Sequence, residues 1–324
     1  MGYILLCMLE HAHPAVDSGL TIGFDIGGTN LRAAAIDADG EIVDSVSVPT
    51  AKVATQLEDD IARAVEELSA THEISAVGLA LAGFLDPECE TVRFAPHLPW
   101  RDAPVREILS KRIGLPVRLE HDANSAAWGE WRFGAGRGAK DWVFFAVGTG
   151  IGATLMTEDK IYRGAFGTAP EFGHLTVVPG GRECSCGKRG CLERYASGTA
   201  LPDTCEELRP QYETKLPANA TGVQITQAAR EGDPLGLAVM ENFGTWLGQG
   251  LSIVADVLDP ELIVVGGGVA NDADLYLERA RENMARQIVG AGHRPLARVA
   301  TAELGSAAGM IGVADLARHG LTVG

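Results

Sequence analysis

The sequence has little positive charge and no long apolar segment. Lys and Arg number 27 against 43 Asp and Glu, which gives a formal net charge of −16. Because nucleic-acid backbones and anionic membranes are bound by basic surfaces, we expect neither as a partner. No stretch is apolar for eighteen residues, so we expect no membrane-spanning helix.

The sequence also lacks the features of a secretory leader. The apolar run Tyr3–Leu9 is short, no basic region precedes it, and Glu10 and His11 follow it directly. We therefore expect a cytoplasmic protein. Cysteine is scarce, with six residues in total, and Cys7, Cys89 and Cys205 stand alone as expected free thiols.

What the chain does contain is apolar residues and glycine. It has 324 residues, of which 46% are hydrophobic and 40 are glycine. These values are typical of a globular α/β protein that is large enough for two domains.

The three remaining cysteines form a cluster with one histidine. Cys184, Cys186 and Cys191 have the spacing C-x-C-x4-C, and His174 precedes them by ten residues. Four such ligands on a short chain are typical of a tetrahedral zinc site, and the nearby glycines supply the bends (Gly180, Gly181, Gly187 and Gly190). The alternatives are buried thiols beside an unrelated histidine, or a disulfide, which cytosolic proteins rarely keep.

Two carboxylates flank this cluster. Neither Glu171 nor Glu193 is needed to complete four metal ligands. We interpret the metal as structural, holding both glutamates and His174 towards a polar substrate.

Three glycine-rich turns follow apolar runs. The first contains Asp25 and then Gly27, Gly28, Thr29 and Asn30. Backbone N–H groups of glycine can approach a phosphate, the Thr and Asn side chains add donors, and Asp25 could hold Mg²⁺ through water. An ordinary glycine hairpin with a capping Asp is the alternative.

The second turn, Gly148, Thr149 and Gly150, repeats this strand–turn–strand pattern. Two such hairpins suggest a duplicated fold with a nucleotide between its halves. The third turn, Gly266, Gly267 and Gly268, permits close approach of a flat ligand such as a base or ribose.

Asp122 lies where an expected strand, 117–120, meets an expected helix, 123–133. It could cap the helix, act as a general base at the carboxyl end of a strand, or do both.

Periodicity predicts the order βββαβα at the start of the chain. We expect a meander of strands over 20–48, helices over 53–71 and 101–113, and a strand over 74–82. Residues 204–223 lack periodicity and read as a loop. The longest predicted helix is 234–259, followed by a strand, 261–265, and a helix, 273–289.

Together these segments resemble the ROK sugar kinases, and within them the glucokinases of actinobacterial type. The matching segments cover residues 20 to about 318; they are Asp25–Asn30, Ala82–Phe84, Phe94–Trp100, Asp122–Asn124, Trp131–Gly136, Gly148–Gly152, Glu171–His174, Cys184–Glu193, Gly266–Val269 and Ala308–Met310.

This resemblance implies an actin-like ATPase fold (a ribonuclease H-like, duplicated βββαβα fold) with two domains around a cleft. We expect a small domain of residues 19–121 plus 307–324, and a large domain of residues 122–306 that contains the zinc-binding segment 174–193.

The resemblance also implies an activity, the ATP-dependent phosphorylation of the C6 hydroxyl of glucose. Asp122 matches the general base. The sugar-binding positions are His121, Asp122, Glu171, His174 and Glu193; the zinc ligands are His174, Cys184, Cys186 and Cys191; and the Mg²⁺–ATP positions are Asp25 and the glycine turns at 27–30, 148–150 and 266–268. Relatives often form homodimers or homotetramers, so we expect one of these.

Two positions depart from the family pattern. His121 replaces the usual Asn, and Pro170 replaces the usual Gly before the sugar-binding glutamate. The sequence therefore does not decide whether the sugar is glucose, another hexose or an N-acetylhexosamine. It also does not decide whether the phosphoryl donor is ATP or polyphosphate.

Two other classes of function explain the sequence less well. A sugar-sensing repressor of the same fold needs a DNA-binding domain ahead of the first glycine turn, and only nineteen residues precede Leu20. A non-catalytic zinc module would leave Asp25, Asp122 and the paired glycine turns unexplained.

Overall fold

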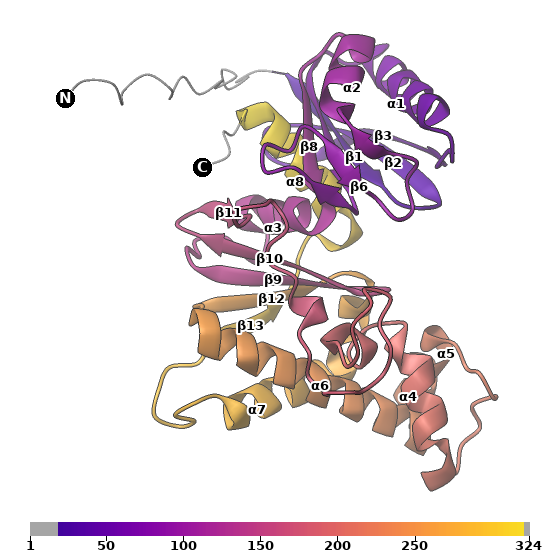
Figure 1. Cartoon of the computed structure of the whole chain (residues 1–324), viewed down its shortest axis with the longest axis vertical. Helices are drawn as coiled ribbons and strands as arrows, with labels where there is room; N and C mark the ends of the chain where they lie inside the picture. The colour runs from indigo at the N-terminus through magenta and orange to yellow at the C-terminus, as the bar shows by residue number, and fades with distance from the viewer. Residues whose placement is uncertain (1–18, 321–324) are drawn as a thin grey trace. The chain divides into compact units, whose positions relative to one another are not determined.

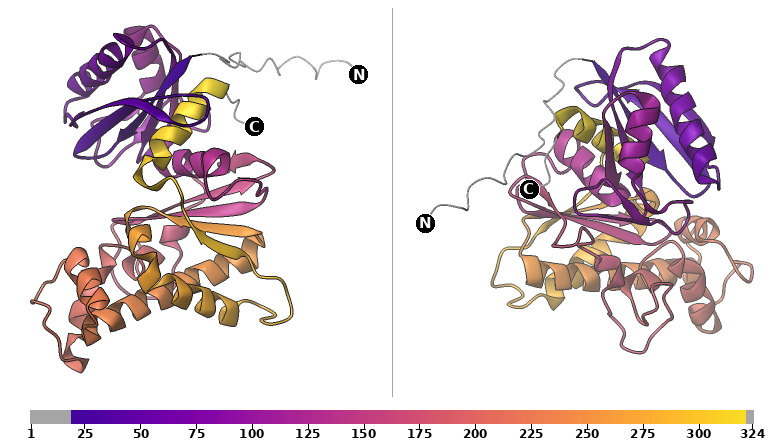
Figure 2. Two further views of the ribbon diagram at one scale, coloured as in Figure 1. Left: turned by 180° about the vertical axis from the view of Figure 1, so that it is seen from behind. Right: turned by 45° about the horizontal axis from the view of Figure 1, so that its top comes forward.

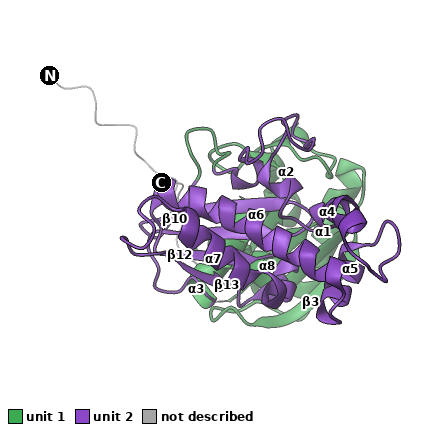
Figure 3. Cartoon of the chain, turned by 90° about the horizontal axis from the view of Figure 1, so that it is seen from below, with its two compact units in different colours: residues 1–133, 163–169, 307–324 green, residues 134–162, 170–306 purple. Residues whose placement is uncertain are grey.

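A computed structural model describes residues 19–320 of the chain. Our expectations for the apolar run at 3–9 and for Cys7 lie outside this range. The chain divides into two compact units (Figure 3): unit 1 contains residues 1–133, 163–169 and 307–324, and unit 2 contains residues 134–162 and 170–306. Unit 1 thus includes residues 122–133 and 163–169, which the sequence analysis assigned to the large domain.

Unit 1 is built on a five-stranded sheet in the order β3-β2-β1-β4-β8. Its strands are β1 (Leu20–Ile26), β2 (Asn30–Ile36), β3 (Ile42–Pro49), β4 (Ile74–Leu81) and β8 (Val117–His121). The first three form the predicted antiparallel meander, and β4 and β8 continue the sheet in parallel. The carboxyl ends of β1, β4 and β8 therefore meet at one edge.

Four helices cover this sheet. Helices α1 (Ala54–Ser69) and α2 (Val105–Ile113) lie on one face, and α8 (Ala308–His319) lies on the other beside α3 (Asp122–Phe133) (Figures 1 and 2). The helix expected over residues 53–71 is present as α1, and its apolar residues are buried, with Leu57 and Ile61 fully enclosed.

A small second sheet of unit 1 corrects one prediction. Strands β5 (Phe84–Leu85), β6 (Val92–Phe94) and β7 (Arg101–Ala103) pair in that order. The helix expected to begin at Arg101 therefore begins only after Pro104. The Arg101 guanidinium donates to the carbonyls of Ala95 and Leu98, which fixes this residue in the sheet.

Unit 2 repeats the first sheet. Its strands are β9 (Trp142–Val147), β10 (Ile151–Thr157), β11 (Lys160–Tyr162), β12 (Leu262–Gly266) and β13 (Arg298–Thr301), in the order β11-β10-β9-β12-β13. As in unit 1, two antiparallel pairings on one side of the central strand are balanced by two parallel pairings on the other. The expected duplication is confirmed.

Helices α6 (Pro234–Leu258) and α7 (Leu277–Gln287) run side by side under this sheet (Figures 1 and 3). Asp233 caps α6 by accepting from the N–H groups of Leu235 and Gly236. The loop predicted over residues 204–223 is shorter than expected, because α4 (Ala200–Leu208) extends into the start of the range and α5 (Gly222–Arg230) begins at its end; residues 212–221 contain no helix or strand. Residues 268–275 form a 3₁₀ segment. The helix that we expected to begin at residue 273 therefore begins only at Leu277, as α7.

Among residues 19–320, no helix combines the length and the apolar character needed to cross a bilayer.

Glycine lets α8 pack against both α3 and the sheet of unit 1. A β-carbon added at Gly312 would lie 1.7 Å from the carbonyl oxygen of Ser125 on α3, and one added at Gly23 would lie 2.0 Å from the carbonyl oxygen of Met310. Backbone cannot yield to such overlap without moving a helix.

We expect Gly312→Ala to destabilise the protein by about 3 kcal/mol or more, because the methyl group would push α8 off α3. Gly309→Ala on the same helix is the control, since its β-carbon would lie 4.0 Å from the nearest atom, the Asp122 carbonyl oxygen. Urea unfolding of both variants measures the effect. Equal stability of the two would show that the α3–α8 contact is looser than described.

Candidate active site

Asp122 is the first residue of α3 and follows directly on β8. Its Oδ1 accepts from the N–H of Ala123 at 2.7 Å and lies 3.2 Å from Nδ1 of His121. The side chain is 46% exposed, so its carboxylate stays accessible to a ligand. The hydrogen bond that Oδ1 accepts comes from the next residue, whereas an N-cap accepts from the N–H two or three residues on, so it is not the expected capping bond; the general-base interpretation stays a prediction.

The first glycine turn lies at the same sheet edge, because it follows β1. The N–H of Gly27 donates to the carbonyl of Asn30 at 3.0 Å, and the Thr50 hydroxyl donates to the carbonyl of Gly27 at 2.7 Å. A β-carbon at Gly28 would lie 2.9 Å from Cβ of His97, so a larger residue would displace that side chain. The ammonium group of Lys52 donates to the carbonyl of Gly28.

Asp25 is not free in this turn. It pairs across the sheet with Arg32, whose Nη2 lies 2.5 Å from the Asp25 carboxylate. A cation held by Asp25 would share the carboxylate with this guanidinium.

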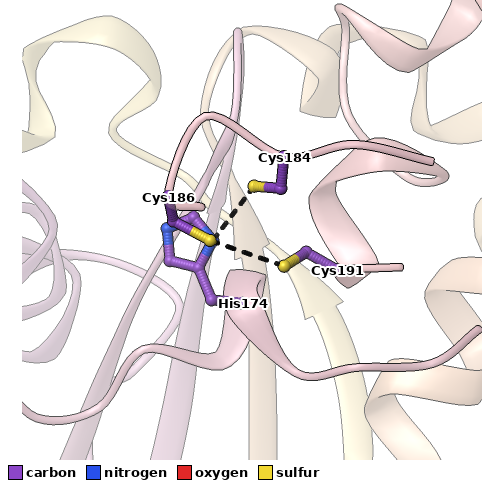
Figure 4. A group of neighbouring side chains, drawn as sticks. All are labelled: His174, Cys184, Cys186 and Cys191. Carbon is purple, nitrogen blue, oxygen red and sulfur yellow. Dashed lines mark hydrogen bonds between the residues drawn. The ribbon is translucent and has the colours of Figure 1, made fainter. Parts of the chain in front are cut away.

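The His–Cys cluster of unit 2 is assembled (Figure 4). The ligand atoms of His174, Cys184, Cys186 and Cys191 all lie within 4.8 Å of one another. Sγ of Cys186 and Sγ of Cys191 are 3.7 Å apart, and Sγ of Cys184 lies 3.6 Å from Nδ1 of His174. A tetrahedral zinc ion would separate two sulfurs by roughly 3.8 Å, and a sulfur from a nitrogen by roughly 3.5 Å. The residues therefore fit such an ion.

The disulfide alternative does not fit the same distances. A disulfide requires sulfurs about 2.0 Å apart. All five cysteines among the described residues are free, including the expected lone thiols Cys89 and Cys205.

Glu193 connects this cluster to the second glycine turn. Its Oε1 accepts from the Cys184 thiol at 3.0 Å and lies 3.6 Å from Nδ1 of His174. Its Oε2 accepts from the N–H of Ile151 at 3.4 Å, and a β-carbon at Gly150 would lie 2.7 Å from that oxygen. Glycine at 150 thus makes room for the carboxylate.

The second flanking glutamate is on the other side of His174. Oε2 of Glu171 lies 3.8 Å from Nε2 of His174, and its side chain is 46% exposed. His174 therefore turns Nδ1 towards the cysteines and Nε2 towards Glu171. One imidazole can serve a metal and a polar ligand at once.

The two glycine turns of unit 2 also lie together. They follow the parallel strands β9 and β12, and a β-carbon at Gly267 would lie 2.4 Å from the carbonyl oxygen of Val147. Gly267 has φ of +82°, which suits glycine. Loops at the carboxyl ends of adjacent parallel strands are the usual place for a ligand in α/β proteins.

Sequence reasoning missed a segment that supports these turns. The N–H of Gly198 donates to the carbonyl of Gly148 at 2.8 Å, and the Thr199 hydroxyl donates to the carbonyl of Thr149 at 2.8 Å. The available signal was a glycine between two hydroxyl residues, Ser197-Gly-Thr199, directly before α4.

The expected site residues fall into two groups. Unit 1 holds Asp25, the turn 27–30, His121 and Asp122, whereas unit 2 holds Glu171, His174, the cysteines, Glu193 and the turns 148–150 and 266–268.

Comparisons with known proteins identify the family of this chain. The model of the ROK family matches residues 21–319. A glucokinase of Streptomyces coelicolor is 42% identical over 93% of this chain and 98% of its own length, and one of Halalkalibacterium halodurans is 34% identical over 90% and 92%.

A solved structure is similarly close. The crystal structure of a ROK family glucokinase from Streptomyces griseus in complex with glucose and AMPPNP has a TM-score of 0.80 and 41% identity, covering 93% of this chain and 99% of that one. This chain therefore has the actin-like fold expected from the sequence. It belongs to the ROK family.

Proposed function

We propose that this protein is a glucokinase that transfers the γ-phosphoryl group of ATP to the C6 hydroxyl of glucose. The observation that carries the proposal is the 41% identity, over nearly the full length of both chains, to a glucokinase crystallised with glucose and AMPPNP. We place the reaction in the cytoplasm, where ATP is available and thiols stay reduced.

In this proposal Asp122 is the general base. Phosphoryl transfer depends on in-line positioning and charge neutralisation, and the attacking hydroxyl must lose its proton. The Asp122 carboxylate is half-exposed at the end of β8, and one of its oxygens is bonded to the helix start. Its second oxygen is then directed to the sugar hydroxyl.

We assign sugar binding to Glu171, His174 and Glu193 of unit 2. Each carboxylate can accept from two neighbouring hydroxyls, and Nε2 of His174 faces Glu171. His121 takes the place of the family's usual asparagine. Its Nδ1 lies 3.2 Å from Asp122, so we propose that it orients the base as well as contacting the sugar.

We propose that the cluster of His174, Cys184, Cys186 and Cys191 binds structural zinc. Zinc would tie the segment 184–193 to His174 and so hold Glu193 in place. Burial raises the pKa of the Cys184 thiol to about 12, so metal binding must displace its proton. The hydrogen bond from this thiol to Glu193 would then be lost, and the Glu193 carboxylate could accept hydrogen bonds from the sugar instead.

The three glycine turns are proposed as the ATP site. The turn 27–30 and the turn 148–150 present backbone N–H groups and hydroxyls suited to phosphates, and the open Gly268 leaves space for the nucleoside. Mg²⁺ would neutralise phosphate charge, and Asp25 would reach it through water.

A substrate panel tests the proposal. We expect the largest kcat/KM for glucose with ATP, with mannose, fructose and N-acetylglucosamine at least about tenfold lower, because hydrogen-bonded sites reject altered hydroxyls strongly. The reactions with ATP are followed by ADP release. The reactions with polyphosphate are followed by the formation of sugar phosphate. A higher kcat/KM for another hexose, or for polyphosphate, would reassign the substrate or the donor within the family.

A further inference from the structure

A buried ion pair lies directly behind the Asp122 turn. Glu120, on β8, is fully buried, and its Oε2 lies 2.5 Å from Nη2 of Arg163, whose side chain is 9% exposed. Arg118 approaches the same oxygen at 3.5 Å. Burial favours the neutral acid, but the two guanidinium groups outweigh it and hold the pKa of Glu120 below its usual range.

The other oxygen of Glu120 holds the turn itself. Oε1 accepts from the backbone N–H of His121 at 3.0 Å and from Nδ2 of Asn124 at 3.0 Å. These two groups lie on either side of Asp122 in the chain. The Glu120 carboxylate therefore joins Arg163 to both flanks of the proposed base.

This connection matters because Asp122 has little packing of its own. Its side chain is 46% exposed, and its carboxylate contacts the adjacent residues Ala123 and His121. Besides the His121 ring, the direction of the carboxylate therefore depends on the backbone of the turn, which Glu120 fixes.

Arg163 is in turn held by a closed loop. The segment Arg163–Ala169 belongs to unit 1 although the chain on both sides belongs to unit 2. The N–H of Ala169 donates to the carbonyl of Arg163 at 3.0 Å, and a β-carbon at Gly167 would lie 3.1 Å from the carbonyl carbon of Asp86. The guanidinium is thus anchored by a segment distant in sequence from β8.

We propose that Arg163 and Glu120 are positioning residues that fix the orientation of the Asp122 carboxylate for proton removal. This inference rests on the proposed role of Asp122 as general base. Stability alone does not require such a pair, because apolar residues of similar volume often replace buried ion pairs without loss.

The test compares Arg163→Met, Arg163→Lys and Glu120→Gln with the wild type, well below their unfolding temperatures. We expect Arg163→Met and Glu120→Gln each to lower kcat by about 100-fold, the cost of a misplaced catalytic group, with KM for glucose and ATP nearly unchanged. Arg163→Lys keeps the charge, and we expect it to recover part of kcat. If Arg163→Met does not fold, Arg163→Lys and the near-isosteric Glu120→Gln carry the test.

Arg132→Met is the matched control. Arg132 pairs at 3.0 Å with Asp315, another buried carboxylate of unit 1, which lies on α8 and outside the Asp122 turn. We expect it to lower Tm while kcat stays at the wild-type value.

Wild-type kcat in folded Arg163→Met and Glu120→Gln would overturn the inference. The inference would also be overturned if Arg132→Met lost as much kcat as the Arg163 and Glu120 variants for the same fall in Tm. Full turnover in Asp122→Asn would instead refute the base assignment itself, which separates failure of the pair from failure of the proposed function.

Discussion

Asp122→Asn is expected to lower kcat by about 1000-fold, because the amide keeps the shape of the carboxylate but cannot take the proton of the attacking hydroxyl. The loss falls within the usual range for removal of a general base. Since the hydrogen bond from the N–H of Ala123 can be kept by the amide oxygen, the turn should survive. We expect KM for glucose and ATP to change by less than about tenfold, because only the transition state is affected.

The control is Asp102→Asn. Asp102 is in unit 1, its side chain is 79% exposed, and its nearest charged partner, Arg93, is 4.0 Å away. This variant should turn over like the wild type. The measurement is ADP release at saturating substrates. If Asp122→Asn releases ADP at more than about a tenth of the wild-type rate, Asp122 is not the general base.

Cys186→Ser is expected to remove zinc and glucose binding together. Cys186 is exposed, so its loss leaves little cavity, but the Cys184–Glu193 segment would no longer be tied to His174. Elemental analysis should find about one zinc ion per chain in the wild type and much less in the variant. Calorimetry should show a Kd for glucose raised by at least about 100-fold, as two sugar ligands lose their positions.

Cys205→Ala is the control for this change, because Cys205 is in unit 2 but outside the cluster. Its zinc content should equal that of the wild type. Zinc absent from the wild-type protein, or glucose affinity unchanged in zinc-free Cys186→Ser, would contradict the proposed role of the cluster.

Much of the fold could be predicted because local pattern and global structure agree. The meander of unit 1 alternates with turns that glycine and Asp dictate, and α6 has a strong cap at Asp233 and an apolar stripe. The duplicated sheets appear in the sequence as two strand–turn–strand segments at corresponding places.

Other elements depended on contacts that periodicity does not reveal. Arg101 has a side chain that suits a helix, yet it joins β7 because its guanidinium is bound by carbonyls of the preceding loop. Helix α4 was missed because its buried residues, among them Leu201 and Cys205, are few, and the helix is short.

The site divides in the same way. The cluster and glycine turns could be found because their ligands are near one another in sequence. The Glu120–Arg163 pair could not, since its members are 43 positions apart and each alone resembles a surface charge. The pairing of Asp25 with Arg32 was also missed, although strand register brings the two residues opposite each other.

Product identity tests the proposed reaction most directly. After incubation with glucose and Mg²⁺–ATP, ³¹P NMR with proton coupling should show a phosphomonoester coupled to the C6 protons of glucose, and much less of it with Asp122→Asn. A protein that binds glucose but yields no phosphorylated sugar, or an ester at another carbon, would contradict the assignment of a C6-specific glucokinase.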